Sequence, residues 1–469
     1  MTPIFQPSST AAGLHSRRAF LKRNAALAAF TGSPIAGLLA ALGAQAQVSQ
    51  NSSEDFKALV CVFLLGGNDQ SNLIVPTDAS PYAAYRSARP DIAQTQASLL
   101  PISPLGYTGP ALGFAPQMAG LQSLFNEQHC AIVANVGTLV APINRAEWNN
   151  GSPTVAVPAQ LFSHSDQQGA WQTGIPDRAS QTGWLGRMGD ILVPAMQASS
   201  PLSICVSTGG DNMIQVGESV IQYQITTDGA VRVNQLDDLF GDNAAGGAAL
   251  KSILTTGTSH LMEAQFAGIA KRAIDNEGLV NTALASAAVA TPFADNALGK
   301  QLKMVARMIK ARASFGHKRQ IYFVSMGGFD FHDNVLAEQA PRLQVLSDEL
   351  KSFYDATVEL GIARNVTSFT ASEFGRALQS NGRGSDHGWG GHQFVVGGAV
   401  QGKRVVGQFP TVALGSADDA GNGILLPTTA LDQMAGNLAT WFGVPASGLS
   451  DVLPNIGRFA GSDIGLFAG

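Results

Sequence analysis

Three continuous apolar segments, each followed by a turn that carries a carboxylate, constrain the fold of this chain most. They span residues 58–65, 321–326 and 366–370. Apolar runs of this length without alternation are typical of parallel strands buried on both faces of a sheet. The turns after them carry Asp69, Asp330 and Glu373, respectively. Because ligands of open parallel sheets bind at the carboxyl ends of strands, we expect these acids to converge at one edge.

Helical periodicity fills part of the sequence between these runs. Apolar residues return every three or four positions over residues 298–315 and 336–360. The second of these segments lies between two predicted strands, where a right-handed crossover requires a helix. We therefore predict an α/β fold with a doubly wound, mostly parallel sheet that has helices on both faces.

Two insertions are expected within about residues 175–318 of a single domain that spans residues 58–469. Residues 213–233 alternate in polarity and contain the turn sequence Asp228-Gly229, which indicates a β-hairpin at a sheet edge or in a small insertion. The alanine-rich residues 244–290 are helical in character.

Residues 1–46 have the pattern of an export signal. Four basic side chains and no acidic one precede an apolar run over residues 25–42 and a small-residue site that ends at Ala46. The segment Ser16 to Lys22 resembles the twin-arginine motif. We expect cleavage after Ala46, a polar linker over residues 47–57 and a periplasmic or extracellular protein. An ordinary secretory signal or an uncleaved anchor is the alternative.

The low charge content excludes some functions. Charged residues make up 13% of the chain, against about 25% in typical globular proteins. Basic residues, 29 in number, do not outnumber the 34 acidic ones, which argues against nucleic acid as a partner. Cys61, Cys130 and Cys205 each lie in an apolar run, so we expect buried thiols rather than disulfides or a cysteine-rich metal site.

Histidines gather near the predicted strand ends. The glycine-rich segment 384–392 allows tight folding, so His387 and His392 can point into one space. Asp330 and His332 lie two positions apart just after a strand, which places both on one side of an extended chain. Carboxylates and imidazoles in such an arrangement are ligands for first-row metals.

Each of these residues also has a simpler interpretation when taken alone. An Asp that follows a strand often caps the next helix, and a histidine beside Trp389 can fill a polar niche in the core. Their shared position at strand ends, in a chain with few charges, favours a metal or acid/base site.

A further segment, residues 161–174, predicts a helix start. Ser163 with Asp166 three positions later resembles an N-cap arrangement. His164 and Ser165 would then lie in the first turn, where free N–H groups and the helix dipole stabilise an anion.

Four motifs together resemble a large family of exported bacterial proteins. The motifs are residues 66–72, 327–332, 372–376 and 386–392. The family is labelled only as domain of unknown function number 1501 and is placed in the alkaline phosphatase and sulfatase superfamily. The resemblance implies an alkaline-phosphatase-like fold with one or two divalent metal ions, zinc, manganese or calcium. The metal ligands that it implies are Asp69, Asp330, His332, Glu373 and His392, with His387 as an extra candidate and Asp386 as a ligand or as a partner that orients an imidazole.

The chain departs from the superfamily pattern at two positions. His164, flanked by Ser163 and Ser165, stands where relatives carry a Ser, Thr or Cys nucleophile. Phe374 follows Glu373 where many relatives have a histidine ligand. Either His164 or Ser165 is the nucleophile, or His164 binds metal, or catalysis has been lost.

The resulting hypothesis is a metal-dependent hydrolase of phosphate or sulfate esters that acts on a small-molecule or glycan substrate. His164 or Ser165 would attack, and Arg376 or Arg145 would stabilise the equatorial oxygens. The alternative is an inactive exported protein that keeps the fold for binding or assembly, and a redox metalloprotein with iron or copper is a third option. The sequence identifies no protein partner.

Overall fold

A computed structural model describes residues 55–196, 200 and 202–468 of the chain. These residues belong to one compact unit of residues 53–469. The predicted signal segment, residues 1–46, and most of the predicted linker lie outside the described residues.

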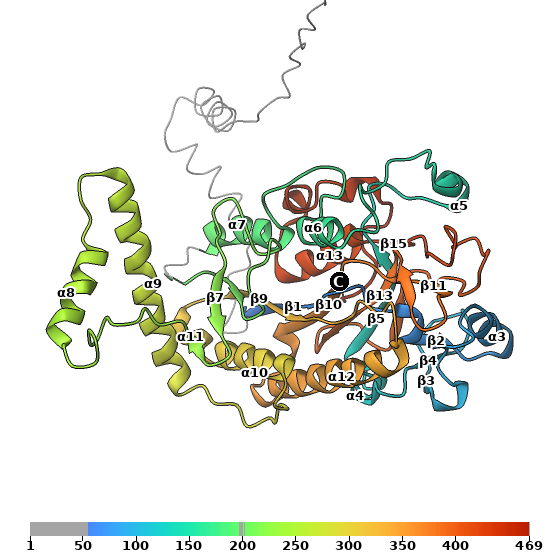
Figure 1. Cartoon of the computed structure of the whole chain (residues 1–469), viewed down its shortest axis with the longest axis horizontal. Coiled ribbons are helices and arrows are strands. Elements are labelled where there is room, and N and C mark those ends of the chain that lie inside the picture. The colour runs from blue at the N-terminus through green and yellow to red at the C-terminus, as the bar shows by residue number, and fades with distance from the viewer. Residues whose placement is uncertain (1–54, 197–199, 201, 469) are drawn as a thin grey trace, which may run out of the picture. The chain divides into compact units, whose positions relative to one another are not determined.

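A ten-stranded sheet forms the centre of this unit (Figure 1). The strand order is β14-β5-β13-β10-β1-β9-β6-β7-β8, and β15 pairs with β5. The bounds are β1 (Lys57–Leu64), β5 (Cys130–Gly137), β6 (Cys205–Ser207), β7 (Tyr223–Thr226), β8 (Gly229–Ala230), β9 (Arg319–Met326), β10 (Val366–Ser372), β13 (Gly391–Gly397), β14 (Arg404–Val406) and β15 (Thr429–Ala430). The sheet is mostly parallel, as predicted, with β13 antiparallel to both of its neighbours.

The three apolar runs of the sequence become β1, β9 and β10, and β1 lies between the other two. In β1, Leu59, Cys61 and Phe63 pack into the core on one face of the sheet. Val60, Val62 and Leu64 pack into the core on the other face. Because burial of one such side chain contributes about 1.5–3 kcal/mol, a strand in this position needs apolar residues on both faces.

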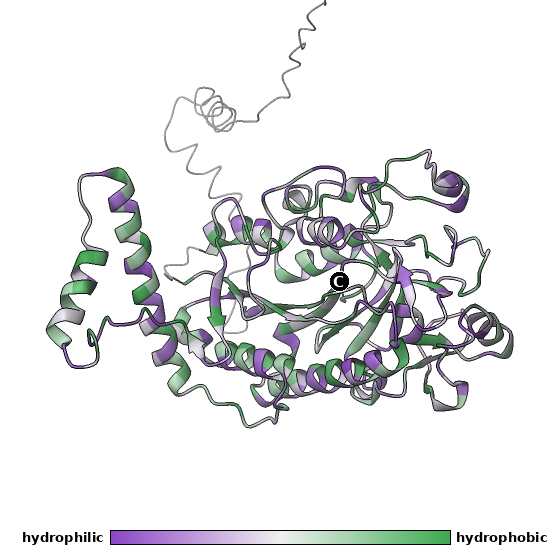
Figure 2. Ribbon diagram, viewed as in Figure 1, coloured by the Kyte–Doolittle hydropathy of each residue, from purple (hydrophilic) through white to green (hydrophobic). Residues whose placement is uncertain are grey.

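Helices cover both faces of the sheet, with α4, α10 and α12 on one side and α6, α7 and α13 on the other (Figure 1). Figure 2 shows the central strands as mainly hydrophobic, whereas α12 carries both hydrophilic and hydrophobic residues. The helices are α3 (Ala79–Ala88), α4 (Ala119–Asn126), α5 (Arg145–Trp148), α6 (His164–Thr173), α7 (Trp184–Met196), α8 (Ala244–Thr255), α9 (Leu261–Ala285), α10 (Ala297–Lys310), α11 (Arg312–Phe315), α12 (Val335–Glu359), α13 (Leu431–Phe442) and α14 (Leu449–Val452).

Two small sheets complete the described structure. Strands β2 (Ile74–Pro76), β3 (Leu100–Ile102) and β4 (Leu112–Phe114) pair antiparallel in the order β2-β4-β3. Strands β11 (Arg376–Ser380) and β12 (Ser385–His387) form a hairpin immediately before β13. This hairpin connects the end of β10 to the start of β13.

The predicted hairpin over residues 213–233 is much shorter than expected. Only β7 and β8 pair, around the turn at Asp228-Gly229, and β7 extends the edge of the central sheet beside β6. The carboxylate of Asp190 accepts hydrogen bonds from the backbone N–H groups of three residues before β7, at 2.6–2.9 Å. Those N–H groups are therefore not available for a strand ladder.

The remaining predictions on local structure agree with the described elements. The two periodic segments form α10 with α11 and α12, and the alanine-rich segment forms α8 and α9. Cys61, Cys130 and Cys205 are buried free thiols in strands of the same sheet.

Candidate metal centre

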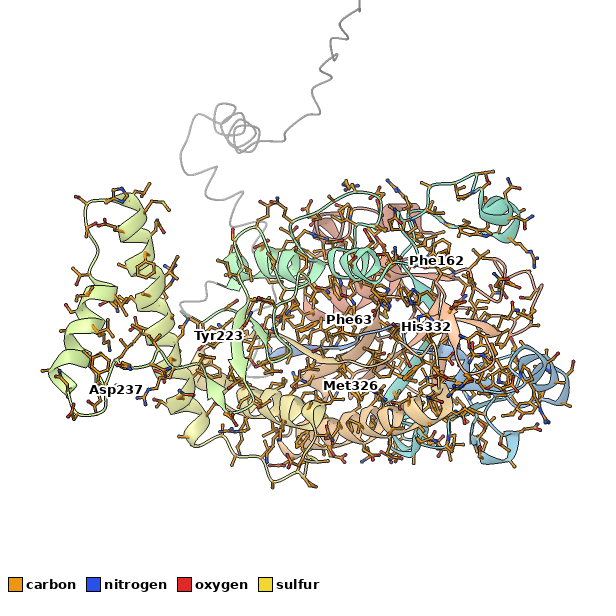
Figure 3. All side chains as sticks on the ribbon, viewed as in Figure 1. Phe63, Phe162, Tyr223, Asp237, Met326 and His332 are labelled. Carbon is orange, nitrogen blue, oxygen red and sulfur yellow. The ribbon has the colours of Figure 1, made fainter. Side chains whose placement is uncertain are left out.

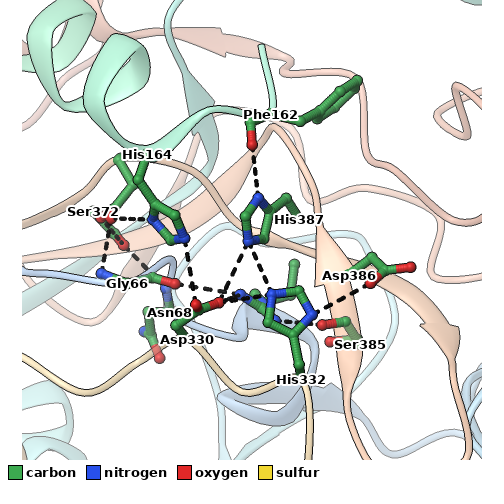
Figure 4. Close-up of polar contacts among 12 residues, drawn as sticks. Gly66, Asn68, Phe162, His164, Asp330, His332, Ser372, Ser385, Asp386 and His387 are labelled. Atoms are coloured by element: carbon green, nitrogen blue, oxygen red, sulfur yellow. Dashed lines mark hydrogen bonds and ion pairs between the residues drawn. The ribbon is translucent and has the colours of Figure 1, made fainter. Parts of the chain in front are cut away.

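The direction of β13 brings distant segments of the chain together. Since β13 runs antiparallel to β10, its first residue lies at the same edge as the carboxyl ends of β1, β9 and β10. The turn after β9 supplies Asp330, the turn after β10 supplies Glu373, and β12 supplies His387. The first residue of α6, His164, meets them there (Figure 4).

Three of these side chains can hold a metal ion. One ligand atom each of His164, Asp330 and His387 lies within 4.8 Å of the other two. Nε2 of His164 is 3.5 Å from Oδ2 of Asp330, and Nε2 of His387 is 3.4 Å from Oδ1 of the same carboxylate. Two imidazoles thus face one carboxylate from two sides (Figure 4).

Hydrogen bonds fix the orientation of both imidazoles. Nδ1 of His164 is 2.9 Å from Oε1 of Glu373, and Nδ1 of His387 is 2.7 Å from the carbonyl oxygen of Phe162. A carbonyl or carboxylate oxygen only accepts, so each Nδ1 carries the proton and donates it. Each Nε2 therefore keeps a lone pair that faces Asp330, which is the arrangement found in histidine ligands of metals.

Glu373 is itself held in place. Its side chain is fully buried, and Oε1 accepts hydrogen bonds from the N–H of Gly66 at 2.8 Å and from Nε2 of Gln168 at 3.0 Å. Gln168 is not among the site residues predicted from the sequence. Its spacing of four residues from His164 on α6 was the available signal, because residues four apart share one face of a helix.

Arg376 provides a fixed positive charge beneath Asp330. Its guanidinium is buried and donates to Oδ1 of Asp330 at 2.7 Å, to the carbonyl oxygen of Gly66 at 3.3 Å and to that of Ser385. Burial acts to raise the pKa of the Asp330 carboxyl, but Arg376, with His332 and His164, holds that pKa below its usual value. Asp330 is therefore a carboxylate that can act as a ligand.

His332 and Asp386 extend the cluster toward solvent. Nε2 of His332 is 2.9 Å from Oδ1 of Asp330 and 3.0 Å from Nε2 of His387. Nδ1 of His332 is 3.3 Å from Oδ1 of Asp386, whose side chain is 78% exposed. Both predicted residues thus lie at the site, with Asp386 in contact with an imidazole.

Phe374 packs against both histidines that face Asp330. Its ring centroid is 4.5 Å from that of His387 and 4.9 Å from that of His164. Burial lowers the pKa of His387, and the positive charge of the nearby Arg376 guanidinium lowers it further. Gly67 has a φ of +80°, and a Cβ at this position would overlap the Phe374 ring. The glycine thus makes room for the aromatic residue that replaces the expected histidine.

Asp69 is not part of this cluster, in contrast to the expectation. Its carboxylate is fully buried and binds the guanidinium of Arg89 through both oxygens, at 2.5 and 2.9 Å. Oδ1 also accepts a hydrogen bond from the N–H of Ser71 and so caps the short helix that follows β1. The simpler interpretation, in which an Asp after a strand caps the next helix, describes this residue.

His392 is also placed apart from the cluster. It is the second residue of β13, is 3% exposed and stacks on Phe409. Its Nδ1 accepts a hydrogen bond from the N–H of Asn135 at 3.1 Å. Burial lowers the pKa of His392 to about 3, so the ring is neutral. It occupies a polar niche in the core rather than a position beside Asp330.

The serines and the second arginine lie elsewhere. Ser165 is exposed, and its hydroxyl lies 3.3 Å from that of Ser163. Ser163 stands at the N-cap, as predicted, but its hydroxyl bonds to the Asp166 carboxylate at 2.5 Å instead of a backbone N–H. Arg145 is at the surface and donates to the carbonyl oxygen of Ser416. None of these groups contacts Asp330 within the described part of the chain.

The donor set favours some metals over others. Two imidazoles and one carboxylate form a mixed nitrogen and oxygen set that suits zinc or manganese. Calcium requires six to eight oxygen ligands, which this set does not supply. Three protein ligands also leave a coordination position for water or substrate, as in catalytic zinc sites.

Comparison with known proteins agrees with the motifs. The family described as "Protein of unknown function (DUF1501)" matches residues 56–443. The chain belongs to this family. No curated protein matches the chain. Among the described residues, no helix combines the length and apolar character that a membrane span requires.

Two solved structures show a weak overall similarity to this chain. One is Ps i-CgsB in complex with k-i-k-neocarrahexaose, with a TM-score of 0.29 and 9% identity over 83% of this chain and 72% of that chain. The other is a mutant form of the alkaline phosphatase PafA, with a TM-score of 0.25 and 10% identity over 70% of this chain and 64% of that chain. The central sheet with helices on both faces is seen directly in the structure of this chain. It does not rest on these two similarities.

Proposed function

We propose that this family member is an exported metal-dependent hydrolase of phosphate or sulfate esters, with a doubly wound fold of the alkaline phosphatase type. One observation carries the proposal. His164 and His387 each donate from Nδ1 to a fixed oxygen and direct Nε2 at Asp330. A group of two oriented lone pairs and one carboxylate is a preformed site for a divalent cation.

The chain's own residues have separate tasks in this proposal. His164, Asp330 and His387 hold the metal, and Glu373 and the Phe162 carbonyl keep the two imidazoles in the correct tautomer. When bound, a divalent metal polarises the ester oxygen and stabilises negative charge as the ester bond breaks. The export signal predicted in residues 1–46 supports action in the periplasm or outside the cell.

His164 is assigned to metal binding rather than to attack on the ester. Its Nδ1 is bonded to Glu373 and its Nε2 faces Asp330, while the Ser165 hydroxyl faces Ser163. We therefore assign attack to water. His332 lies beside both His387 and Asp330 at the solvent side, where its Nε2 donates a hydrogen bond to the Asp330 carboxylate, so the proton of that water passes to solvent.

The test uses protein purified after export. Elemental analysis is expected to find zinc or manganese, and a panel of phosphate and sulfate monoesters is expected to show turnover. His387→Ala and Asp330→Ala should each remove bound metal and turnover together. His260→Ala is the matched control, since His260 is exposed at the start of α9. Full turnover in either site variant would contradict the proposal.

A second candidate function is binding or assembly without turnover. It is favoured by the absence of a hydroxyl at His164 and by the apolar Phe374 beside the two imidazoles. Bound metal without turnover on the whole ester panel would support this candidate.

A further inference from the structure

A cavity of about 550 Å³ adjoins the candidate metal centre. His332 and His387 line both the cavity and the cluster around Asp330. Phe162 lines the cavity as well, and Figure 3 labels it together with His332. A group bound in this cavity would therefore lie next to the ester bond that the proposed hydrolase cleaves.

Two carboxamides line the cavity without a partner in the protein. The N–H of Gln379 donates to the carbonyl oxygen of Asn422 at 3.3 Å, so the two residues are neighbours. Both residues are exposed, and over the described residues neither side-chain amide forms a hydrogen bond with another protein group, so both amides face solvent and are open to a ligand. Each amide offers a donor and an acceptor together, which matches adjacent hydroxyl groups of a ligand.

Ser380 adds a third polar group to the same wall. Its hydroxyl oxygen accepts a hydrogen bond from the N–H of Gly382 at 2.9 Å. The hydroxyl proton is therefore free to donate to a ligand, because a serine hydroxyl can accept and donate at once.

The apolar part of the lining suits a ring with C–H groups. The side chains of Phe162 and Ile424 lie in this lining, and Phe162 is 40% exposed. An exposed aromatic side chain in a pocket offers a flat apolar surface, while a small number of polar groups sets the orientation of the ligand.

The charge of the lining disfavours a second anionic group on the ligand. No lysine or arginine lines the cavity, and Asp386 is its one carboxylate. Nucleotides and polyanions require several cationic side chains, since a buried phosphate without them is unpaired. The free amides and hydroxyl fit an uncharged ligand instead.

We propose that this cavity binds the alcohol part of the ester and that this part is a neutral polyhydroxylated ring, such as a sugar. Gln379, Asn422 and Ser380 hydrogen-bond to its hydroxyl groups, and Phe162 packs against its C–H face. The proposal deepens the proposed function and rests on it for the ester group, but the cavity binds the ring whether or not turnover occurs.

The first experiment measures kcat/KM of the metal-loaded full chain for a hexose 6-phosphate, a hexose 6-sulfate, two aryl esters and a nucleoside monophosphate. The sugar ester of the favoured anion should exceed the nucleotide by tenfold or more. In Gln379→Ala/Asn422→Ala, the ratio of sugar-ester to aryl-ester kcat/KM should fall about tenfold, mainly through KM. Gln265→Ala, an exposed glutamine of α9, is the matched control and should keep the ratio.

The second experiment measures binding of the unesterified hexose by calorimetry, which does not depend on turnover. Binding that is lost in the double variant supports the cavity assignment, even if no ester is cleaved and the hydrolase proposal fails. Turnover of aryl esters with no hexose binding and an unchanged ratio in the double variant overturns the inference and leaves the hydrolase proposal intact. Preference for the nucleotide, or absence of both binding and turnover, also overturns it.

Discussion

Nδ1 of His164 lies 2.9 Å from Oε1 of Glu373, although the two residues are 209 positions apart in the chain. The carboxylate is buried and the imidazole is partly exposed, so the hydrogen bond anchors the first turn of α6 to the end of β10. It also sets which nitrogen of His164 is free.

Glu373→Gln is expected to weaken metal binding without unfolding the protein. The amide keeps the shape of the side chain but removes the negative charge that makes the His164 imidazole a better ligand. Loss of such a partner typically reduces metal affinity by about 10–100-fold. Competition titration with a chelating dye measures the change, with Glu338→Gln on the exposed side of α12 as control. Equal affinities in the two variants would show that Glu373 does not act through His164.

Asp69→Asn is expected to reduce stability and leave metal content unchanged. The substitution leaves the buried guanidinium of Arg89 without its ionic partner. Removal of one member of a buried ion pair costs about 3–5 kcal/mol. Urea unfolding measures this free energy, and elemental analysis of the folded fraction measures metal. Metal loss at unchanged stability would instead identify Asp69 as a ligand.

Phe374→Ala is expected to affect both stability and the metal centre. The side chain is 2% exposed, and truncation of a buried Phe costs about 3–5 kcal/mol. The two imidazoles that pack on the ring would lose their support, so metal affinity should also fall. Phe467→Ala is the control, because Phe467 stacks on Trp441 away from these imidazoles. If Phe374→Ala bound metal as tightly as the control Phe467→Ala, the packing role of Phe374 at the metal centre would be refuted.

Asp432 gives the expected pH dependence of stability. Burial raises the pKa of this carboxyl from 3.8 to about 7. The unfolded state thus loses the Asp432 proton at a lower pH than the folded state. The tighter proton binding of the folded state therefore adds to the free energy of unfolding in full below about pH 4, and this contribution is lost as the pH rises to 7. Its decline is at most about 1.4 kcal/mol per pH unit. Urea midpoints between pH 4 and 9 should decline less in Asp432→Asn. Parallel curves for wild type and variant would exclude Asp432 as the source.

The central strands could be predicted because burial on both faces leaves a direct trace in the sequence. In β1, no residue from Ala58 to Leu64 is more than 1% exposed, and none is charged. The short strands β6 and β7 leave a weaker trace, because three or four residues are too few to establish a period.

The positions of Asp69 and His392 could not be derived from the sequence. Both follow the same pattern as the residues of the cluster, namely a polar side chain near a strand end. Asp69 is bound by Arg89, whose guanidinium also donates to two backbone carbonyl oxygens within β11. His392 is the second residue of β13 and is buried against Phe409, which its position in the sequence does not reveal. Such competition between partners depends on tertiary structure.

The orientation of His387 was also outside the reach of sequence reasoning. Its Nδ1 bonds to a backbone carbonyl, that of Phe162, and a backbone acceptor has no residue type that could mark it. By contrast, the Asp330–His332 pair was predictable, since their spacing of two after a strand fixes a common side.

The antiparallel course of β13 has a consequence for assembly during synthesis. His164 is synthesised long before Asp330 and His387, and His387 lies in β12, directly before β13, which pairs with both β10 and β5. A nascent or truncated chain that ends before β12 therefore lacks one of the three candidate metal ligands. Retention of a metal ion by the purified protein would report that β12 and β13 have docked in their native places.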